Sequence, residues 1–427
     1  MDSKFTVAII GCGSRGVYAY GNEMIKMPDK WDIVALCDCN KNKLTLARER
    51  FSVQDENCFL NEEVFFEKRR ADVLVIATQD KDHVRMGIRA LELGYSVLLE
   101  KPISPLKEEL KKLLEAKHKY GGTVMVCHVL RYAPAFVRCK KILDSGELGR
   151  LIRIETIEQV AYWHQAHSYV RGNWRKEEET SPMIMAKCCH DLDLLQYYAG
   201  ARGKRVYSTG NLSFFDAENK PDGAADRCAE CKYISDCPYS AEHCYVERWK
   251  NAGCPKDRWP YNVVQPNVPH TEEKLRRAYQ SGPYGRCVFA CDNDVVDNQS
   301  VSIVFENGVC ADLTMTAFTS EAGRRTTFHC THGELRLVED EDVLEIMPFG
   351  KEKRVLKMAD IVAESMNDSF GHGGGDYGIV QGLYQVLTAG EEADTSLEKS
   401  VESHLLALAA EESRKTGQVI ALHENEK

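Results

Sequence analysis

The chain has 427 residues, of which 43% are hydrophobic and 28% charged, enough for two globular domains of ordinary size. Its formal net charge of −10 argues against a nucleic-acid or anionic-membrane partner, because no basic excess exists to neutralise phosphate. We see no apolar run long enough to span a bilayer and no secretory leader, so we expect a cytoplasmic location. Its 17 cysteines are then expected to be free thiols or metal ligands rather than a disulfide scaffold.

The first predicted strand leads into a glycine-rich turn. Residues 5–10 are an apolar run, and Gly11, Gly13 and Gly16 follow it in the spacing G-x-G-x-x-G. The first glycine permits a tight turn, the second lets a phosphate approach the backbone, and the third lets a helix pack closely on the strand. This pattern predicts a dinucleotide site in which backbone N–H groups and a helix N-terminus hold a pyrophosphate. A structural turn that binds nothing is the alternative.

An acidic residue ends the next apolar run, residues 33–37. Asp38 lies about 20 residues beyond the last glycine, where a carboxylate accepts the ribose hydroxyls of a dinucleotide. The same charge repels a 2′-phosphate, so NAD is favoured over NADP, although Lys41 and Lys43 nearby offset part of that repulsion.

Strands and helices continue to alternate as far as residue 130. We expect strands at 73–77, 96–99 and 123–127, with helices at 83–93 and after Pro105. This order predicts an α/β dinucleotide-binding domain over residues 1–130, with a doubly wound parallel sheet and the ligand at the carboxyl ends of its strands.

The pattern then changes to that of a second, α+β domain over residues 131–427, built on an open and mainly antiparallel sheet. We expect helices from Ser181-Pro182 to Gly200 and over 397–415. Strands are expected at 151–160, 301–305 and 309–317, the last two joined by the hairpin signal Glu306-Asn307-Gly308, and around Thr326, Leu335 and Leu344. The open sheet face predicts a homo-oligomer, a dimer or tetramer.

Two strands of the first domain end in residues suited to a dinucleotide. Ala77-Thr78-Gln79 would pass along the nicotinamide ribose, and Glu100-Lys101-Pro102 would hold an ammonium group near the nicotinamide. There Lys101 would hydrogen-bond a substrate oxygen and stabilise developing alkoxide character. The alternative is a surface ion pair between Lys101 and Glu100.

With these motifs the chain resembles the Gfo/Idh/MocA family of oxidoreductases. The resemblance rests on residues 11–16, 77–79 followed by His83, 100–102, 131–134 and 189–193. It implies a Rossmann domain, an open-sheet domain, a nicotinamide cofactor and a sugar, polyol or related substrate, with Lys101 as catalytic lysine and His190 as acid–base histidine. The residues expected at the cofactor are Gly11, Cys12, Gly13, Ser14, Arg15, Gly16, Asp38, Ala77, Thr78, Gln79, His83, Glu100, Lys101 and Pro102.

His190 is also a candidate from its own surroundings. The predicted helix carries Asp193 three residues further on, where its carboxylate would orient the imidazole and set its tautomer. A core histidine held by a helical neighbour is the alternative. The chain departs from the family at Ala186, where many members carry an Asp four residues before the histidine. Either Lys187 joins Lys101 in binding substrate oxygen, or the proton path differs.

A polar and aromatic segment precedes this helix, with His164, His167, Tyr169, Arg171, Asn173 and Trp174. Aromatic faces stack on a pyranose while Arg and Asn bind hydroxyls, so the segment predicts carbohydrate recognition; an ordinary surface loop is the alternative. A second loop, 372–376, would approach the site or simply lead into a helix. The residues expected at the substrate are Arg131, Tyr132, Arg171, Trp174, Lys187 and His190.

Residues 216–285 form a cysteine-rich insert with little apolar material. Its spacing C-x2-C-x5-C-x6-C fits a tetrahedral structural zinc site that would hold the segment together. An iron–sulfur cluster and free thiols are the alternatives. The four expected ligands are Cys228, Cys231, Cys237 and Cys244.

Three functions follow as hypotheses. The first is an NAD-dependent dehydrogenase acting on a secondary alcohol of a sugar, polyol or glycoside. The second is an NAD-dependent glycoside hydrolase or lyase, in which transient ring oxidation acidifies the neighbouring carbon and elimination expels the aglycone. The third is a sensor that binds the dinucleotide without turning it over.

Overall fold

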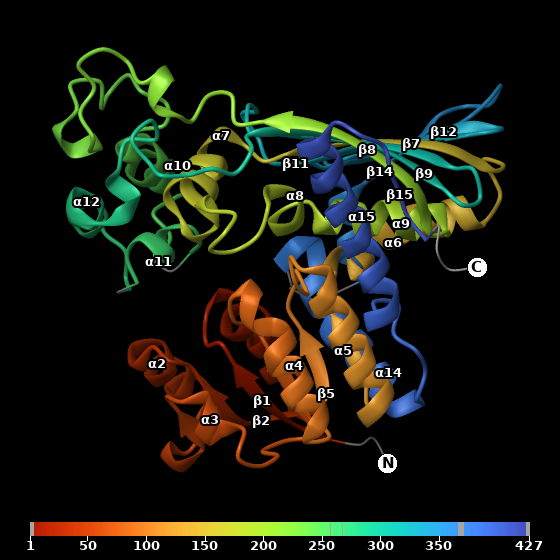
Figure 1. Ribbon diagram of the computed structural model, residues 1–427, viewed down its shortest axis with the longest axis horizontal. Coiled ribbons are helices and arrows are strands. Elements are labelled where there is room, and N and C mark those ends of the chain that lie inside the picture. The colour runs from red at the N-terminus through yellow and green to blue at the C-terminus, as the bar shows by residue number, and fades with distance from the viewer. Residues whose placement is uncertain (1–3, 257, 267, 366–370, 424–427) are drawn as a thin grey trace.

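The computed structural model describes residues 4–256, 258–266, 268–365 and 371–423, which form two sheet-based units stacked one above the other (Figure 1). The N-terminal unit has a six-stranded parallel sheet in the order β3-β2-β1-β4-β5-β6. Because the order changes direction between β1 and β4, a ligand is expected at the carboxyl ends of these strands. The strands are β1 (Phe5–Ile10), β2 (Trp31–Cys37), β3 (Cys58–Phe59), β4 (Val73–Ile76), β5 (Ser96–Leu99) and β6 (Val124–Val126).

Helices cover both faces of this sheet, because the central strands bury their side chains on both faces. One face packs on α4 (His83–Glu92) and α5 (Lys107–Tyr120), and the other on α1 (Asn22–Ile25), α2 (Lys41–Phe51) and α14 (Gly375–Ala389). The structure confirms the predicted Rossmann sheet. The sequence pattern did not indicate that α14, from the far end of the chain, completes the second face of this sheet. Among the helices of the described ranges, none has the length and apolar character needed to cross a membrane.

The second unit is a nine-stranded sheet in the order β14-β13-β12-β11-β7-β10-β9-β8-β15. Every neighbouring pair is antiparallel except β7 and β10, which confirms the mainly antiparallel sheet. The predicted hairpin joins β9 to β10, with Gly308 at φ +87°. The strands are β7 (Leu151–Gln159), β8 (Gly203–Asn211), β9 (Asn298–Phe305), β10 (Cys310–Thr316), β11 (Gly323–Cys330), β12 (Gly333–Val338), β13 (Val343–Pro348), β14 (Arg354–Lys357) and β15 (Ile420–Ala421).

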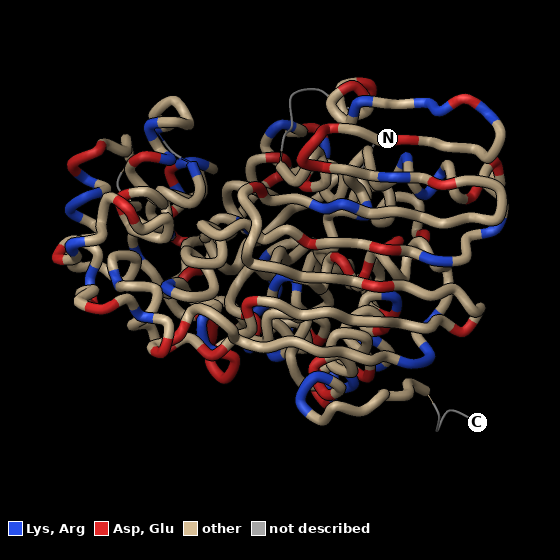
Figure 2. Tube along the Cα trace, turned by 90° about the horizontal axis from the view of Figure 1, so that it is seen from above, with Lys and Arg blue, Asp and Glu red and all other residues tan. Residues whose placement is uncertain are grey.

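The two faces of this sheet differ in what covers them. Helices α6 (Pro134–Asp144), α9 (Cys189–Ala199), α13 (Met358–Ser365) and α15 (Leu397–Thr416) share one hydrophobic core with the inward side chains of the strands. Figure 2 shows the opposite face, where charged residues of both signs lie along the strands. The homo-oligomer that this open face suggests stays a prediction.

The predicted helix from Ser181 to Gly200 is two helices. α8 (Met183–Ala186) ends at Ala186, with Lys187 as its C-cap. α9 starts at Cys189, after Cys188, whose backbone angles are not helical. This break lies between Ala186, where the sequence departs from the family pattern, and His190, where it matches that pattern again.

The insert has a core of its own, contrary to the expectation that it lacks apolar material. Its helices α10 (Arg248–Asn251), α11 (Tyr261–Val264) and α12 (Glu272–Ser281) bury a cluster of aromatic and aliphatic side chains against α7 (Tyr162–His164). Tyr245, Trp249 and Leu275 are among its buried members. Ala241, Tyr245 and Trp249 recur every four residues, and Leu275 and Tyr279 are four apart. A helical period was therefore present in the sequence but was not used to predict a core.

Candidate active site

A cavity of about 710 Å³ runs from the carboxyl ends of β1, β2, β4 and β5 to the underside of the second unit. The glycine turn and Asp38 line one end, and Trp174, Lys187 and His190 line the other. Lys101 lies between them at the end of β5. A single space is therefore shared by the predicted cofactor, catalytic and substrate residues.

The glycine turn has the shape that a pyrophosphate requires. A Cβ at Gly11, where φ is +94°, would lie 2.2 Å from the Ala77 carbonyl oxygen, and a Cβ at Gly16 would lie 2.2 Å from that of Gly11. A Cβ at Gly13 would meet no atom within 4 Å and would project into the cavity instead. Gly11 and Gly16 thus serve the packing of the turn, while Gly13 keeps open the space in which a phosphate can approach the backbone.

Asp38 lies at the end of β2 with both carboxylate oxygens anchored. Oδ2 accepts a hydrogen bond from the Cys12 amide and Oδ1 accepts one from the Asn40 amide, each at 2.7 Å. The carboxylate lines the cavity, and its remaining lone pairs can accept the ribose hydroxyls of NAD. Together with the open space at Gly13, this donor and acceptor set fits a dinucleotide.

The predicted cofactor residues separate into two groups. His83, Pro102, Cys12 and Gly16 support the site from behind: the His83 Nδ1 lies 2.7 Å from the Pro102 carbonyl oxygen, within the packed domain. The others line the cavity directly: Gly11, Gly13, Ser14, Arg15, Asp38, Ala77, Thr78, Gln79, Glu100 and Lys101.

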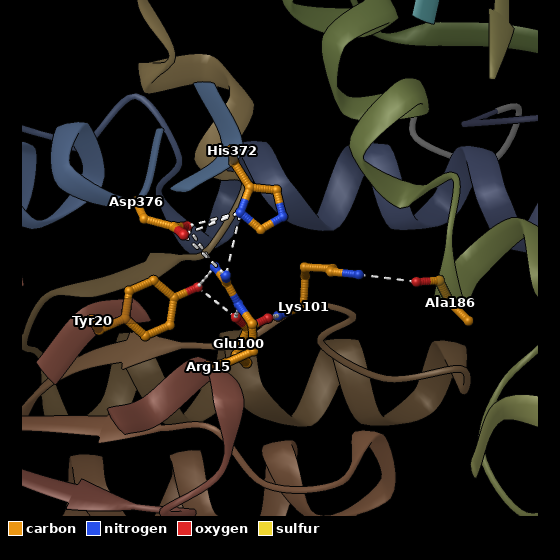
Figure 3. A network of polar contacts seen from close by, with 7 residues as sticks. All are labelled: Arg15, Tyr20, Glu100, Lys101, Ala186, His372 and Asp376. Carbon is orange, nitrogen blue, oxygen red and sulfur yellow. Dashed lines mark hydrogen bonds and ion pairs between the residues drawn. The ribbon is translucent and has the colours of Figure 1, made fainter. Parts of the chain in front are cut away.

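Arg15 of the glycine turn ties that turn to the end of β5 and to α14 (Figure 3). Its guanidinium donates to Glu100 at 2.7 Å and to Asp376 at 2.8 Å, and Tyr20 also donates to Glu100. Burial works to raise the pKa of the Glu100 carboxyl, but Arg15 and Lys101 outweigh it and the pKa lies below its ordinary value. Glu100 is therefore an ionised anchor for Arg15 rather than a surface partner of Lys101.

Lys101 projects into the cavity and donates from Nζ to the Ala186 carbonyl oxygen at 3.0 Å (Figure 3). Ala186 is the position at which the sequence departs from the family pattern. Lys187 also lines the cavity and pairs with Glu158 at 2.8 Å, and Glu158 lies 2.9 Å from Arg324. That Lys187 joins Lys101 in binding a substrate oxygen stays a prediction. Glu158 and Arg324 were not predicted, although the alternation of β7 and β11 puts both on the inward face of the sheet. Arg324 lines the cavity, whereas Glu158 is fully buried and does not.

His190 lines the cavity without the orienting carboxylate expected for it. Burial, with Lys101 close by, holds the pKa of His190 well below its ordinary value, and no described residue hydrogen-bonds its Nδ1. Asp193 instead accepts from Arg131 Nε at 2.6 Å and from Nη2 at 2.7 Å, with both side chains buried. Asp193 and Arg131 use their hydrogen-bonding groups on each other. Asp193 therefore does not orient His190, and Arg131 does not face a substrate.

Aromatic side chains line the substrate end of the cavity, but they are not all residues that were expected there. Trp174, Tyr169 and His164 line it, joined by Trp259 from the insert, whose ring centroid lies 4.9 Å from that of His164. Trp259 carried no signal in the sequence, because only the fold of the insert brings it here.

Three of the expected substrate residues lie elsewhere. Arg131 is paired with Asp193, and the Tyr132 hydroxyl lies 3.2 Å from that of Thr395. Arg171 is 2% exposed and donates to the carbonyl oxygens of Arg286 and Tyr239. Arg171 ties segments of the second unit together, Arg131 is held by α9, and Tyr132 packs on the Rossmann core beside α14. Trp174, Lys187 and His190 reach the cavity.

The zinc site expected at the four cysteines of the insert is not supported. Among the described residues, no three His, Cys, Asp or Glu side chains are arranged to hold a metal ion. The Arg171 guanidinium lies 3.6 Å from the Cys228 sulfur, which puts a positive charge beside the thiols. Burial also raises the pKa of Cys244 to about 11, which favours a protonated thiol over the thiolate that a metal binds.

This fold and cavity define an NAD-binding oxidoreductase, and comparison with known proteins agrees. Residues 5–128 match the family model described as "Oxidoreductase family, NAD-binding Rossmann fold". Residues 140–422 match the one described as "Oxidoreductase family, C-terminal alpha/beta domain". The chain belongs to the Gfo/Idh/MocA family of oxidoreductases.

Individual relatives are distant. The "Putative oxidoreductase YteT" of Bacillus subtilis is 21% identical over 384 residues, 84% of each chain. The 2,7-anhydro-N-acetylneuraminate hydratase of Mediterraneibacter gnavus is 24% identical over 48% of this chain and 51% of its own. A solved structure of levoglucosan dehydrogenase with NADH and levoglucosan superimposes with a TM-score of 0.71 at 17% identity, covering 99% of this chain and 100% of the other.

Proposed function

We propose that this oxidoreductase is an NAD-dependent dehydrogenase acting on a secondary alcohol of a sugar, polyol or glycoside. The observation that carries the proposal is that Lys101 and His190 line one cavity with the glycine turn and Asp38. With its pyrophosphate at Gly13 and its adenosine ribose at Asp38, a dinucleotide would extend its nicotinamide toward the end of β5, where Lys101 lies. The levoglucosan dehydrogenase structure has the same fold, and that enzyme's name supports a carbohydrate-type substrate.

Lys101 has the chemistry to manage the reacting oxygen. When bound, NAD supplies the hydride acceptor. The Lys101 ammonium, now donating to the Ala186 carbonyl, would donate to the substrate oxygen and stabilise its negative charge as the carbon–hydrogen bond breaks. Lys187 and Arg324, held by Glu158, would donate to the other hydroxyls. Trp174, Tyr169 and Trp259 would stack on the apolar face of the sugar and exclude water.

The test is NADH formation from NAD with a panel of levoglucosan, myo-inositol, D-glucose and methyl β-D-glucoside. We expect Lys101→Met to lower kcat about 100- to 1000-fold without changing the Kd for NAD, since it removes a charge that acts on the reacting oxygen. Lys111→Met, at a side chain 70% exposed on α5, is the matched control and should behave as wild type. Full activity of Lys101→Met, or no NADH from any compound, would contradict the proposal.

A second candidate is elimination or hydration through transient oxidation. Two observations favour it: a backbone carbonyl, rather than a carboxylate, accepts the hydrogen bond from Lys101 Nζ, and a relative is a 2,7-anhydro-N-acetylneuraminate hydratase. Such an enzyme would release p-nitrophenol from a p-nitrophenyl glycoside in the presence of NAD without accumulating NADH. A dehydrogenase would form one NADH for each sugar oxidised.

A further inference from the structure

His372 lies at the cavity but has no part in the scheme above. It occupies the turn Gly371–Gly374 that precedes α14, with its own φ at +47°, in the left-handed region. The turn carries the side chain over the glycine loop of the first unit, next to Arg15 and Asp376 (Figure 3). The backbone strain of a non-glycine residue here is of the kind found where a side chain is held for function.

One ring nitrogen of His372 is held by a carboxylate. Nδ1 lies 3.1 Å from both oxygens of Asp376 and 3.3 Å from Nη1 of Arg15. Burial works to raise the pKa of Asp376, but Arg15 and His372 hold it below its ordinary value, so the carboxylate is ionised and only accepts hydrogen bonds. The geometry points to an Nδ1–H that donates to Asp376, which leaves the lone pair on Nε2.

The free nitrogen faces the reacting end of the cavity. In Figure 3 the ring turns its second nitrogen away from Asp376, on the side where Lys101 lies. The ring centroids of His372 and His190 are 6.3 Å apart, a separation that lets one oxygen atom hydrogen-bond to both rings. A substrate hydroxyl placed between the two rings would therefore have the lone pair of His372 within reach, and Lys101 lines the same cavity.

The charges around the two histidines favour His372 as the proton acceptor. His190 faces Lys101, Arg324, His128 and His372, and its Nδ1 has no hydrogen-bond partner among the described residues, so a proton on it would be unfavourable. His372 faces Arg15 as well, but its Nδ1 lies against the Asp376 carboxylate, which can accept the Nδ1–H and hold the ring. Its side chain is also 43% exposed, which gives the proton a path to solvent.

We propose that His372, oriented by Asp376, is the general base of the dehydrogenase, an inference that rests on the proposed function. The oxygen–hydrogen bond of the substrate alcohol breaks, its proton goes to His372 Nε2, and the electron pair forms the carbonyl π bond. The hydride leaves the same carbon for NAD, and the imidazolium later gives its proton to water. His372 is then a catalytic residue, Asp376 a positioning residue, and Lys101 the electrostatic stabiliser of the oxygen.

The activity test compares His372→Gln with His118→Gln, a histidine 72% exposed on α5 that lies outside the site. With the carbohydrate panel, we expect His372→Gln to lower kcat 100-fold or more, leave the Kd for NAD within threefold, and recover part of its rate in added imidazole. His118→Gln should match wild type. Asp376→Asn should lower kcat about tenfold and move the acid limb of the pH profile. A kcat for His372→Gln within threefold of wild type would overturn the proposal.

A second measurement does not depend on the substrate. In ¹⁵N-histidine-labelled full-length protein, the signals lost in His372→Gln identify this ring, and we expect them to report the Nδ1–H tautomer. An Nε2–H tautomer would show that the Nδ1 lone pair faces Arg15, which overturns the proposal. Failure of the wild type to reduce NAD with any sugar would overturn the dehydrogenase function and the base assigned to it, while the tautomer still judges the His372–Asp376 pair separately.

Discussion

Replacing Gly13 by alanine should weaken cofactor binding without harming the fold. Gly13 has φ −89° and extended geometry, which alanine adopts without strain, and its added Cβ would touch no atom within 4 Å. That Cβ would occupy the space in which a pyrophosphate must approach the backbone. Losing hydrogen bonds from backbone N–H groups to a charged phosphate costs about 1.5–3 kcal/mol. The expected result is therefore a Kd for NAD raised about 10- to 100-fold.

Calorimetric titration with NAD and thermal unfolding of the same protein make the test. Gly11→Ala is the contrasting variant: at φ +94°, with its Cβ 2.2 Å from the Ala77 carbonyl oxygen, it should lower Tm as well as affinity. Gly13→Ala should keep the wild-type Tm. If Gly13→Ala binds NAD as tightly as wild type, the phosphate does not approach the turn at this point, and our orientation of the cofactor is wrong.

Three further predictions concern the cofactor, the substrate and stability. Asp38→Asn should improve the Kd for NADP relative to that for NAD about tenfold in the same titration, because a repelling charge is removed. Trp259→Ala should raise KM for the sugar about 2- to 10-fold with the Kd for NAD unchanged, since its ring lines only the far wall. Burial lowers the pKa of His167 and of His404 to about 3, so the unfolded chain binds protons below about pH 6.5 that the folded protein excludes. Stability is then full above that pH and is lost as pH falls. Denaturant titration should show a free energy of unfolding at least about 2.5 kcal/mol lower at about pH 5.5 than at pH 7, since burial also lowers the pKa of His128, His164 and His190. A pH-independent value would contradict these shifts.

Local signals were enough to predict the first unit. The apolar run before Gly11, the spacing of the three glycines and the acidic end of the second run each depend on neighbours in the chain, and the strands and helices form where expected. The hairpin at Gly308 was predicted for the same reason, since a turn with positive φ is encoded by two or three residues. Packing between segments far apart in the chain could not be predicted in this way. No residue near position 375 indicates that α14 covers the Rossmann sheet.

The site was predictable where its residues follow strand ends and unpredictable where two units meet. Lys101 and Asp38 each follow a strand directly, so the fold class alone puts them at the cavity. Asp193 has an equally suggestive spacing from His190, but Arg131, 62 residues away, pairs with it. Trp259 reaches the cavity only through tertiary packing, and its sequence neighbours carry no periodic signal of it. For the loop 372–376 both predicted alternatives hold, because His372 lines the cavity and the turn leads into α14.

The most direct test of the central claim is a crystal structure of the protein with NADH and a sugar that it oxidises. We predict that the oxygen on the reacting carbon lies within about 3.2 Å of the Lys101 Nζ. The nicotinamide should lie on the other side of that carbon. A sugar bound with its reacting oxygen beyond the reach of Lys101, or a nicotinamide at the opposite end of the cavity, would contradict it.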